Sequence, residues 1–387
     1  MRFNTFIDQW ITKTIVQYGK FHYGKSAPKW SVSAEGTIPC VRYGELYTRD
    51  LAKINSIKSY TTIDFEHLVF STGKEVLVPR VGEDPMDFYK CAYLPIKNVA
   101  IGEMISIYET NQDPLFVTYY FRGKMRKKFA QKVEGGNVSN LYYNYLEPLK
   151  VSFPTLAEQQ KIAIFLDLLD QRIDTQSKII EDLELCKKKI YYEIFSAKES
   201  YVKPLGSIIS YGKAGGTPES TNKSYYNGNI PFLSISDMTE QGKYILKTEK
   251  TLSELGLKNS SAWLVSKNSL ILSMYASVGF VSISKVELAT SQAMFSMIIE
   301  DKNLLEYVYY YLNYFKSFKI HRLLETGTQS NINAEMVKNI NIPFFDQTKN
   351  LLITQFFNNF DLKIKKEKDI LELYKKQKAY LLKNMFI

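Results

Sequence analysis

The sequence predicts an α+β protein made of two mixed α/β domains, each followed by a long helix. Three observations support this prediction. The chain has 387 residues, of which 45% are hydrophobic and 23% charged, enough for two domains with separate cores. Its two halves repeat the same short landmarks in the same order, offset by about 191 residues. Each half then enters a segment with the heptad spacing of apolar residues that is typical of a coiled coil.

The repeat is carried by short polar and glycine-containing landmarks. An acidic residue follows the proline of one landmark after six positions in both halves. Because the order is preserved, we interpret the halves as copies of one domain. The matched pairs are Tyr18-Gly19-Lys20 with Tyr211-Gly212-Lys213, Gly36-Thr-Ile-Pro39 and Glu45 with Gly228-Asn-Ile-Pro231 and Asp237, and Gly136-Asn-Val-Ser-Asn140 with Gly327-Thr-Gln-Ser-Asn331.

The two helical segments show apolar residues alternately three and four positions apart, from Ile162 to Ile194 and from Ile353 to Met385. This regularity over about 40 residues favours a helix pair between the two copies over one amphipathic helix packed on its own domain. Each helix would be about 60 Å long. We expect an antiparallel coiled coil with a pseudo two-fold internal repeat. The expected boundaries are domains at 1–153 and 197–342, with helices at 154–196 and 343–387.

Polar residues interrupt both heptad ladders at corresponding places, Gln176 and Lys187 in the first and Glu367 and Lys378 in the second. We predict that Lys187 faces Glu367 and that Gln176 faces Lys378, because the other layers are then apolar or contain Tyr374. A slip of one heptad would leave the Lys187 ammonium without a carboxylate, which is costly. In this prediction the polar layers specify the register of the helices.

The charge of the chain favours a polyanionic partner. The formal net charge is +10 and the pI is about 9.1. Residues 157–196 carry −2 and residues 346–387 carry +4, so the remaining segments carry +8. The excess therefore lies in the two domains, where we expect contact with nucleic acid.

Cysteine, histidine and hydropathy patterns limit the class of protein. Cys40, Cys91 and Cys186 are scattered, as are the three histidines, so we expect neither a disulfide framework nor a structural zinc or other metal site. No run of 18 apolar residues occurs, and the first residues lack the apolar core of a signal peptide. We expect a cytoplasmic protein with no membrane contact.

Two glycine-containing basic segments, Tyr18–Trp30 and Tyr211–Tyr226, suit close approach to a DNA phosphate backbone, although each can equally be an ordinary surface loop. Side chains just after the two Ile-Pro landmarks are candidates for reading base edges. The tyrosine runs at 119–120 and 309–311 lie in periodic apolar stretches and are interpreted as core. The candidate DNA-binding residues are Lys20, Lys25, Lys29, Arg42, Tyr43, Lys213, Thr217, Lys223, Tyr225, Ser234 and Ser236.

No catalytic pattern in the sequence is complete. Residues 19–26 fit the phosphate-binding pattern G-x-x-x-x-G-K-S, but no helical periodicity follows them. Asn229-Ile-Pro-Phe232 and Asn341-Ile-Pro-Phe344 approach the turn that holds adenine in methyltransferases, yet have isoleucine where its first proline should be. We therefore expect a chain without catalytic residues and without a cofactor of its own.

The duplicated order of Tyr-Gly-Lys, Gly-x-Ile-Pro with its acid, Gly-x-x-Ser-Asn, and an apolar-Pro step into a long helix resembles the specificity subunit of type I restriction-modification systems. The resemblance covers essentially the whole chain. It implies that each domain is a target-recognition domain reading one half of an asymmetric bipartite DNA target. The helices would set the spacing of the half-sites and dock two methyltransferase (modification) subunits. Those partners would bind S-adenosylmethionine, and motor and nuclease (restriction) subunits would join them for cleavage.

Two other functions stay open at this point. A single-chain DNA methyltransferase or nuclease would need the catalytic patterns just rejected. An adaptor would bind proteins through its coiled coil and would not read DNA sequence.

Overall fold

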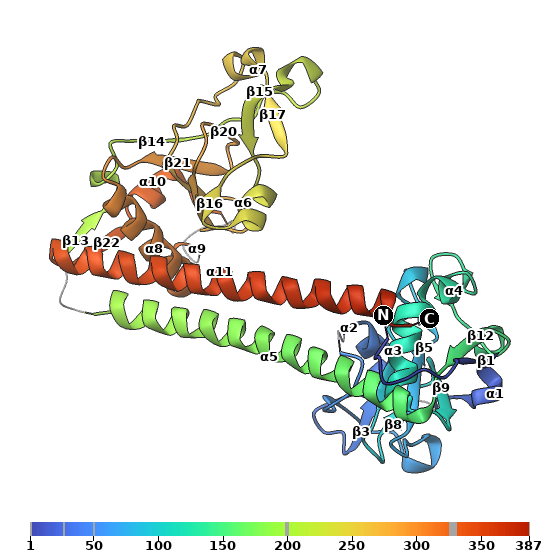
Figure 1. Ribbon diagram of the computed structural model, residues 1–387. Helices are drawn as coiled ribbons and strands as arrows, with labels where there is room; N and C mark the ends of the chain where they lie inside the picture. The colour runs from blue at the N-terminus through green and yellow to red at the C-terminus, as the bar shows by residue number, and fades with distance from the viewer. Residues whose placement is uncertain (1, 26–27, 49–50, 198–200, 325–330, 387) are drawn as a thin grey trace. The chain divides into compact units, whose positions relative to one another are not determined.

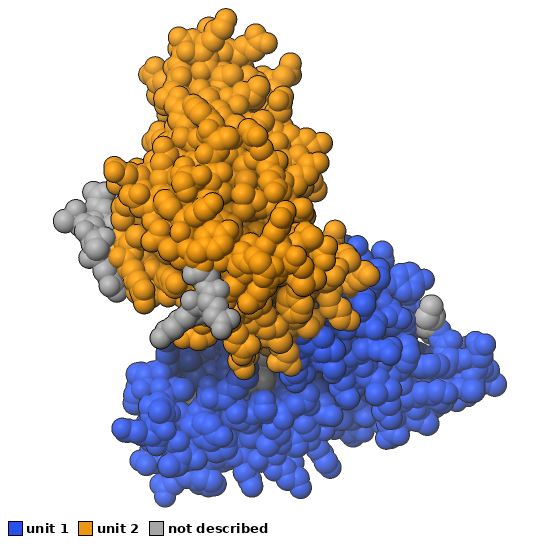
Figure 2. Space-filling view, turned by 90° about the vertical axis from the view of Figure 1, so that its left-hand side faces the viewer, with its two compact units in different colours: residues 1–179, 367–387 blue, residues 180–366 orange. Residues whose placement is uncertain are grey.

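The structure is a computed structural model that describes residues 2–25, 28–48, 51–197, 201–324 and 331–386. The chain forms two compact units, coloured separately in Figure 2. Unit 1 contains Met1–Ile179 and Glu367–Ile387, and unit 2 contains Ile180–Lys366. Each unit holds one α+β domain and part of each long helix, α5 (Leu156–Phe195) and α11 (Gln347–Asn384). Both helices are drawn along their full length in Figure 1.

Unit 1 contains an antiparallel four-stranded sheet, a smaller mixed sheet and several short elements. The larger sheet has the order β2 (Gly19–Tyr23), β9 (Ile105–Thr110), β5 (Glu75–Pro79), β7 (Ala92–Leu94). The smaller has the order β4 (Ser59–Thr61), β3 (Ile38–Val41), β8 (Ala100–Ile101), with β3 and β8 parallel. The other elements are the pair β1 (Ile11–Thr14) and β12 (Lys150–Phe153), the strands β6 (Val81–Gly82), β10 (Glu134–Gly135) and β11 (Ser139–Asn140), and the helices α1 (Ile15–Tyr18), α2 (Tyr43–Thr48), α3 (Pro114–Lys124) and α4 (Arg126–Ala130).

The larger and smaller sheets of unit 2 repeat the strand orders of unit 1 with one added strand, whereas the unit 1 strands β10, β11 and β6 have no counterpart among the described residues of unit 2. Its larger sheet has the order β14 (Tyr211–Ala214), β21 (Met294–Ile298), β18 (Leu270–Ser273), β19 (Val281–Ser284), β16 (Tyr244–Ile245). The smaller has the order β17 (Lys250–Leu252), β15 (Tyr226–Leu233), β20 (Ala289–Thr290). The other elements are the pair β13 (Tyr201–Pro204) and β22 (Asn341–Phe344) and the helices α6 (Ile235–Gln241), α7 (Glu254–Lys258), α8 (Lys302–Phe318), α9 (His321–Leu324) and α10 (Ala334–Lys338).

The strand orders correspond position by position, so the sequence repeat is a repeat of topology. The acid that follows each Ile-Pro landmark has the same task in both units. A Glu45 carboxylate oxygen accepts from the Arg42 backbone N–H at 3.2 Å, and an Asp237 oxygen accepts from the Ser234 backbone N–H at 2.9 Å. Both acids thus cap the helix that follows the strand. Of the last predicted landmark pair, residues 327–330 lie outside the described residues.

The tyrosine runs belong to the cores, as predicted. Tyr119 and Tyr120 on α3 and Tyr309, Tyr310 and Tyr311 on α8 are all buried. Their hydroxyl groups therefore need hydrogen-bond partners inside the protein. For Tyr119 and Tyr310 these partners are aspartates on the long helices.

The long helices run antiparallel within each unit, but their predicted register is wrong. In unit 1 the Gln176 amide donates to a Glu367 carboxylate oxygen at 2.5 Å, and Lys378 pairs with Asp170. In unit 2 Lys187 pairs with Asp361. The predicted pairs Lys187 with Glu367 and Gln176 with Lys378 do not form, and the observed pairing is displaced by about one heptad. The displaced register is acceptable because Asp170 and Asp361, each next to a heptad position, supply the carboxylates that pair with Lys378 and Lys187.

These polar contacts repeat between the units at an offset of 191 residues. In unit 1 Asp170 of α5 accepts from the Tyr119 hydroxyl at 2.8 Å and pairs with Lys378 of α11. In unit 2 Asp361 of α11 accepts from the Tyr310 hydroxyl at 2.9 Å and pairs with Lys187 of α5. The aspartate, tyrosine and lysine are the same repeat positions, with the two helices exchanged. Each triad ties the long helices to the α3 or α8 helix of its own domain.

Candidate nucleic-acid interface

In unit 2, the predicted residues Lys223 and Tyr225 lie on a 3-10 turn, Lys223–Tyr225, that packs against α7. The Ser253 backbone N–H donates to the Tyr225 carbonyl at 3.0 Å, and the Ser253 hydroxyl donates to the Ser224 carbonyl at 2.7 Å. Lys258 of α7 is exposed beside this turn. Figure 1 shows α7, β15 and β17 at the end of unit 2 that is farthest from α11. This end presents lysines on a rigid, hydrogen-bonded support.

In unit 1, the predicted residue Lys29 begins a corresponding 3-10 turn, Lys29–Ser31, that packs against β4. The Ser31 and Thr61 hydroxyls are 2.8 Å apart, and the Thr62 backbone N–H donates to the Ser31 carbonyl at 3.0 Å. Trp30 on this turn is 77% exposed. The two turns hold equivalent places, each just before the central strand of the smaller sheet, β3 or β15. The structure thus places Lys29 and Lys223 at matching positions of the two domains.

Three exposed residues near the two turns were not among the DNA-binding candidates predicted from the sequence: Lys58, Tyr60 and Lys258. Tyr60 of β4 is 42% exposed, and Lys58 precedes the same strand with an exposed side chain. Strand alternation within the Ser59–Thr61 segment was the available signal, because Thr61 is buried and its neighbour must face outward. For Lys258 the signal was weaker, since α7 has only the short 3-10 helix Phe65–His67 as its counterpart in unit 1.

Lys20 and Lys213 lie on the larger sheets, at the edge strands β2 and β14. The Lys20 ammonium is 2.9 Å from a Glu109 carboxylate oxygen, so part of its charge is neutralised within the protein. Lys213 is exposed on β14. These two lysines therefore lie on the larger sheets, whereas Lys29 and Lys223 lie on turns next to the smaller sheets.

The glycines of the two loops are needed by the fold itself. A Cβ added to Gly215 would lie 2.1 Å from the Thr290 carbonyl oxygen, and one added to Gly216 would lie 2.2 Å from the Ser261 hydroxyl. One added to Gly24 would lie 2.1 Å from the Gly102 carbonyl oxygen. Close packing within the protein thus explains why these positions hold glycine. Contact with a bound phosphate is not needed to explain them. The side chains of Lys25 and Thr217, beside them, are exposed.

The phosphate-loop pattern at residues 19–26 does not form such a loop. Gly19–Tyr23 is strand β2, which pairs along its length with β9, and Lys25 donates from its backbone to the Ile101 carbonyl at 2.9 Å. Ser26, the last residue of the pattern, lies outside the described residues. A paired strand cannot wrap its backbone N–H groups around a phosphate.

The four candidates after the Ile-Pro landmarks sit where β3 enters α2 and where β15 enters α6. The Ser234 hydroxyl donates to an Asp237 carboxylate oxygen at 2.5 Å and lies 2.8 Å from the Ser236 hydroxyl, so it already serves the helix cap. Ser236 is exposed. Arg42 and Tyr43 are partly exposed. Their role in base reading stays a prediction.

The two repeat halves match a known domain. Residues 8–185 and 197–374 each match the family described as the type I restriction modification DNA specificity domain. The chain belongs to this family. Its two units therefore contain two DNA specificity domains, as the sequence repeat predicted.

Relatives of this family share a quarter to a third of their aligned residues with the chain. It is 27% identical over 191 residues to the type I restriction enzyme MjaIX specificity subunit of Methanocaldococcus jannaschii, covering 48% of this chain and 43% of that one. It is 25% identical over 279 residues to the EcoR124I/EcoR124II specificity subunit of Escherichia coli, covering 67% and 66%. The chain thus spans less than half of the first relative and about two thirds of the second.

Solved structures show the same fold. The S subunit of the type I restriction-modification system from M. genitalium superposes with a TM-score of 0.61 at 15% identity, covering 100% of this chain and 98% of that one. A chain from a structure concerned with complex assembly and conformational transition of the type I R-M system gives 0.61 at 15% identity, covering 97% and 96%. At this identity the likeness concerns the fold alone.

Within the described ranges, no group of three or more His, Cys, Asp or Glu side chains is placed to hold a metal ion. A search of the same ranges for a helix long and apolar enough to cross a membrane finds none.

Proposed function

We propose that this chain is the sequence-specific DNA-recognition subunit of a type I restriction-modification complex and that it performs no chemistry itself. Each specificity domain would read one half of an asymmetric bipartite target. The observation that carries the proposal is the pair of DNA specificity domains in one chain, with Lys29 and Lys223 exposed on equivalent turns. Such lysines suit phosphate contacts, which position a domain for base reading.

The long helices would dock two modification subunits, which would bind S-adenosylmethionine, and restriction subunits would join for cleavage in the cytoplasm. Large apolar side chains remain exposed on both helices, although an isolated coiled coil needs only its inner seam to be apolar. Partner subunits would cover them. The exposed residues are Leu156, Ile164, Phe165, Leu168, Ile179, Leu373 and Tyr380 in unit 1, and Leu185, Tyr192, Leu352, Phe356 and Leu362 in unit 2.

Deleting the gene for this chain tests the proposed function directly. We expect methylome sequencing to show the loss of one bipartite adenine-methylation motif whose two halves differ, because the two domains share landmarks but diverge between them. An unchanged methylome, or the loss of a perfectly palindromic motif, contradicts the proposal. Robust methyl transfer, ATP hydrolysis or DNA cleavage by the purified chain alone would instead favour the single-chain enzyme.

Replacing Lys29 or Lys223 by alanine is expected to weaken binding of the purified chain to its target DNA. If each lysine contacts one phosphate, the slope of log affinity against log salt becomes less steep by about 1 for each substitution. Fluorescence anisotropy over a range of salt concentrations measures this slope. Lys365→Ala, which removes an exposed lysine of α11, is the matched control and should leave the slope unchanged. Unchanged slopes for both test variants would show that the two turns do not face the DNA backbone.

A further inference from the structure

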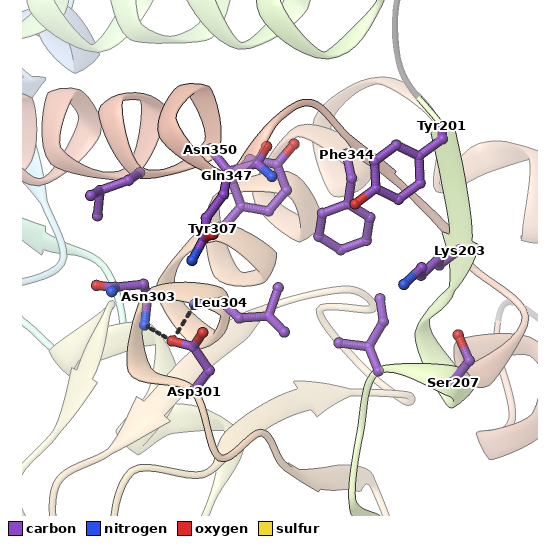
Figure 3. A pocket seen from close by; sticks show the side chains of 12 residues that line it. Tyr201, Lys203, Ser207, Asp301, Asn303, Leu304, Tyr307, Phe344, Gln347 and Asn350 are labelled. Atoms are coloured by element: carbon purple, nitrogen blue, oxygen red, sulfur yellow. Dashed lines mark hydrogen bonds between the residues drawn. The ribbon is translucent and has the colours of Figure 1, made fainter.

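A cavity of about 470 Å³ in unit 2 is lined by Tyr201, Tyr307 and Phe344 among other side chains (Figure 3). Two of its polar side chains have partners within the fold. The Asp301 carboxylate accepts from backbone N–H groups as the cap of α8, and the Tyr307 hydroxyl donates to the Pro343 carbonyl at 2.6 Å. These two groups are therefore satisfied without a ligand.

The Arg80 guanidinium of unit 1 differs in this respect. Arg80 comes directly after β5 and is partly exposed. Its Nε–H group is buried and has no hydrogen-bond partner among the described residues. Buried polar groups in folded proteins nearly always have a partner, so an exception indicates a ligand or a bound water. Arg80 is therefore able to donate to an acceptor from outside the chain.

Two tyrosine rings hold this guanidinium in place. The Arg80 Cζ atom lies 4.6 Å from the ring centroid of Tyr23 and 5.8 Å from that of Tyr142. The Tyr23 ring packs in turn on Tyr143, with centroids 4.6 Å apart, and Tyr143 stacks on Phe21 of β2. An arginine over aromatic ring faces keeps the N–H groups at its edge available for a planar acceptor. The aromatic cluster thus orients the side chain before any ligand binds.

Arg80 lies near the predicted DNA-binding residue Lys25. The backbone N–H of Arg80 donates to the Met104 carbonyl at 3.0 Å, and the backbone N–H of Lys25 donates to the Ile101 carbonyl at 2.9 Å. Both residues are therefore attached to one short segment of the chain, between β8 and β9. The Lys25 side chain is exposed there.

The predicted base reader Tyr43 is also connected to this place. Its ring lies edge-on to the ring of Tyr47, with centroids 6.5 Å apart, and the Tyr47 hydroxyl donates to the Val81 carbonyl at 2.8 Å. Val81 directly follows Arg80, and it lines a cavity of about 380 Å³ together with Tyr43 and Tyr47. The side chain after the Ile-Pro landmark and Arg80 thus belong to one region of unit 1.

The charges beside Arg80 favour a base edge over a phosphate as its acceptor. Glu83 and Asp84, three and four residues farther along the chain, are both exposed. Their carboxylates would repel the DNA backbone, whereas a base edge carries no net charge. Guanine presents two acceptors in the major groove, O6 and N7, which match two parallel N–H groups of an arginine. Guanine is therefore the base that fits an arginine with a fixed orientation.

We infer that Arg80 is a specificity-determining residue of the first domain and reads a guanine in one half of the target. This inference rests on the proposed function, which supplies the DNA. Tyr23 and Tyr142 would be positioning residues, since they act through the guanidinium. In unit 2 the counterpart of β5 is β18, and residues 274–280, which connect it to β19, include no arginine. The other half of the target would therefore be read differently.

Binding to a set of DNA duplexes tests the inference with the full chain. The target is taken from methylome mapping, and each duplex changes one of its base pairs. We expect Arg80→Ala to reduce the discrimination against replacement of one guanine by about 5- to 150-fold, the usual range for a bidentate base contact. Discrimination at the other positions should stay as in the unchanged chain. Lys74→Ala, which removes an exposed cation just before the other end of β5, is the matched control and should alter no position.

A second variant separates base reading from charge and from loss of folding. Arg80→Lys keeps a cation over the tyrosine rings but lacks the planar fork, so it should lose the guanine discrimination and retain most of the general affinity for DNA. A uniform loss of affinity for all duplexes, with a less steep salt dependence, would assign Arg80 to a phosphate and overturn the inference. Unchanged discrimination in both Arg80 variants would also overturn it.

The outcome for the unchanged chain distinguishes this inference from the proposed function. If that chain prefers its bipartite target and the Arg80 variants keep the same preference, the proposed function stands and only the role of Arg80 is wrong. If the unchanged chain prefers no DNA sequence and deletion of its gene changes no methylation motif, the proposed function itself fails.

Discussion

Raising the pH from about 9 to about 11 is expected to destabilise both units strongly, because buried tyrosines ionise only after unfolding. Burial is the main cause that raises the pKa of Tyr108 and Tyr119 in unit 1 and of Tyr307 and Tyr310 in unit 2. For Tyr119 and Tyr310 the neighbouring aspartate raises the pKa further. The pKa in the unfolded chain is about 10. The stability that these groups contribute is therefore complete below pH 10 and is lost as the pH rises above it.

The expected loss is large relative to ordinary protein stability. Each tyrosine whose folded pKa lies well above 10 lowers the free energy of unfolding by about 1.4 kcal/mol per pH unit. The two named tyrosines of each domain together give about 3 kcal/mol per pH unit, against about 5 to 15 kcal/mol of stability for a typical domain. Lys243, Lys316 and Lys319, all in unit 2, act in the opposite direction, because burial lowers their pKa and the folded state then releases their protons first. They are outnumbered, because burial also raises the pKa of Tyr191, Tyr244, Tyr309 and Tyr311 in the same unit.

Urea unfolding followed by circular dichroism at several pH values measures this effect, with the ultraviolet absorbance of tyrosinate as a second signal. Tyr119→Phe and Tyr307→Phe should each reduce the slope above pH 10 by about 1.4 kcal/mol per pH unit. Tyr60→Phe, at an exposed position, is the control and should leave the slope as it was. Stability that is flat up to pH 11 would contradict the burial of these hydroxyl groups.

Replacing Asp170 by alanine is expected to lower the free energy of unfolding of unit 1 by about 3 to 5 kcal/mol, the range found when one partner of a buried ion pair is removed. The Asp170 side chain is 3% exposed. It accepts from the Tyr119 hydroxyl at 2.8 Å and the Ala52 backbone N–H at 3.2 Å, and it pairs with Lys378. The substitution leaves a buried ammonium, a hydroxyl and an amide without this acceptor.

Two comparisons isolate the cause of that loss. Tyr119→Phe removes one hydrogen bond but keeps the ion pair, so it should cost about 1 kcal/mol. Asp174→Ala removes an exposed pair with Lys178 on the same helix and should cost less than about 0.5 kcal/mol. Urea denaturation of the three variants at neutral pH gives the values. Equal losses for Asp170→Ala and Asp174→Ala would show that the triad does not hold the helices to the domain.

The sequence alone determined the repeat, the long helices and the buried tyrosines of this protein. Landmarks such as Gly-x-Ile-Pro contain the residues that a local structure needs, here a strand followed by a capped helix. The same residues are needed wherever the same topology recurs. Heptad spacing reports one helix face, and α5 and α11 follow it over their length. The family assignment rests on the same repeat, which both specificity-domain matches cover.

Only the tertiary structure decided the helix register and the placement of the surface residues. The heptad pattern identifies the residues at the interface between the two helices. Asp170 and Asp361 lie next to that interface, and their side chains extend to Lys378 and Lys187. The turns of Lys29 and Lys223 share no recognisable sequence, so their equivalence appears only from the strands that follow them. The cavity lined by Tyr201, Tyr307 and Phe344 is likewise invisible in the sequence, because it exists where β13, β22, α8 and α11 meet. Contacts between distant segments depend on three-dimensional distance, which periodicity along the chain does not encode.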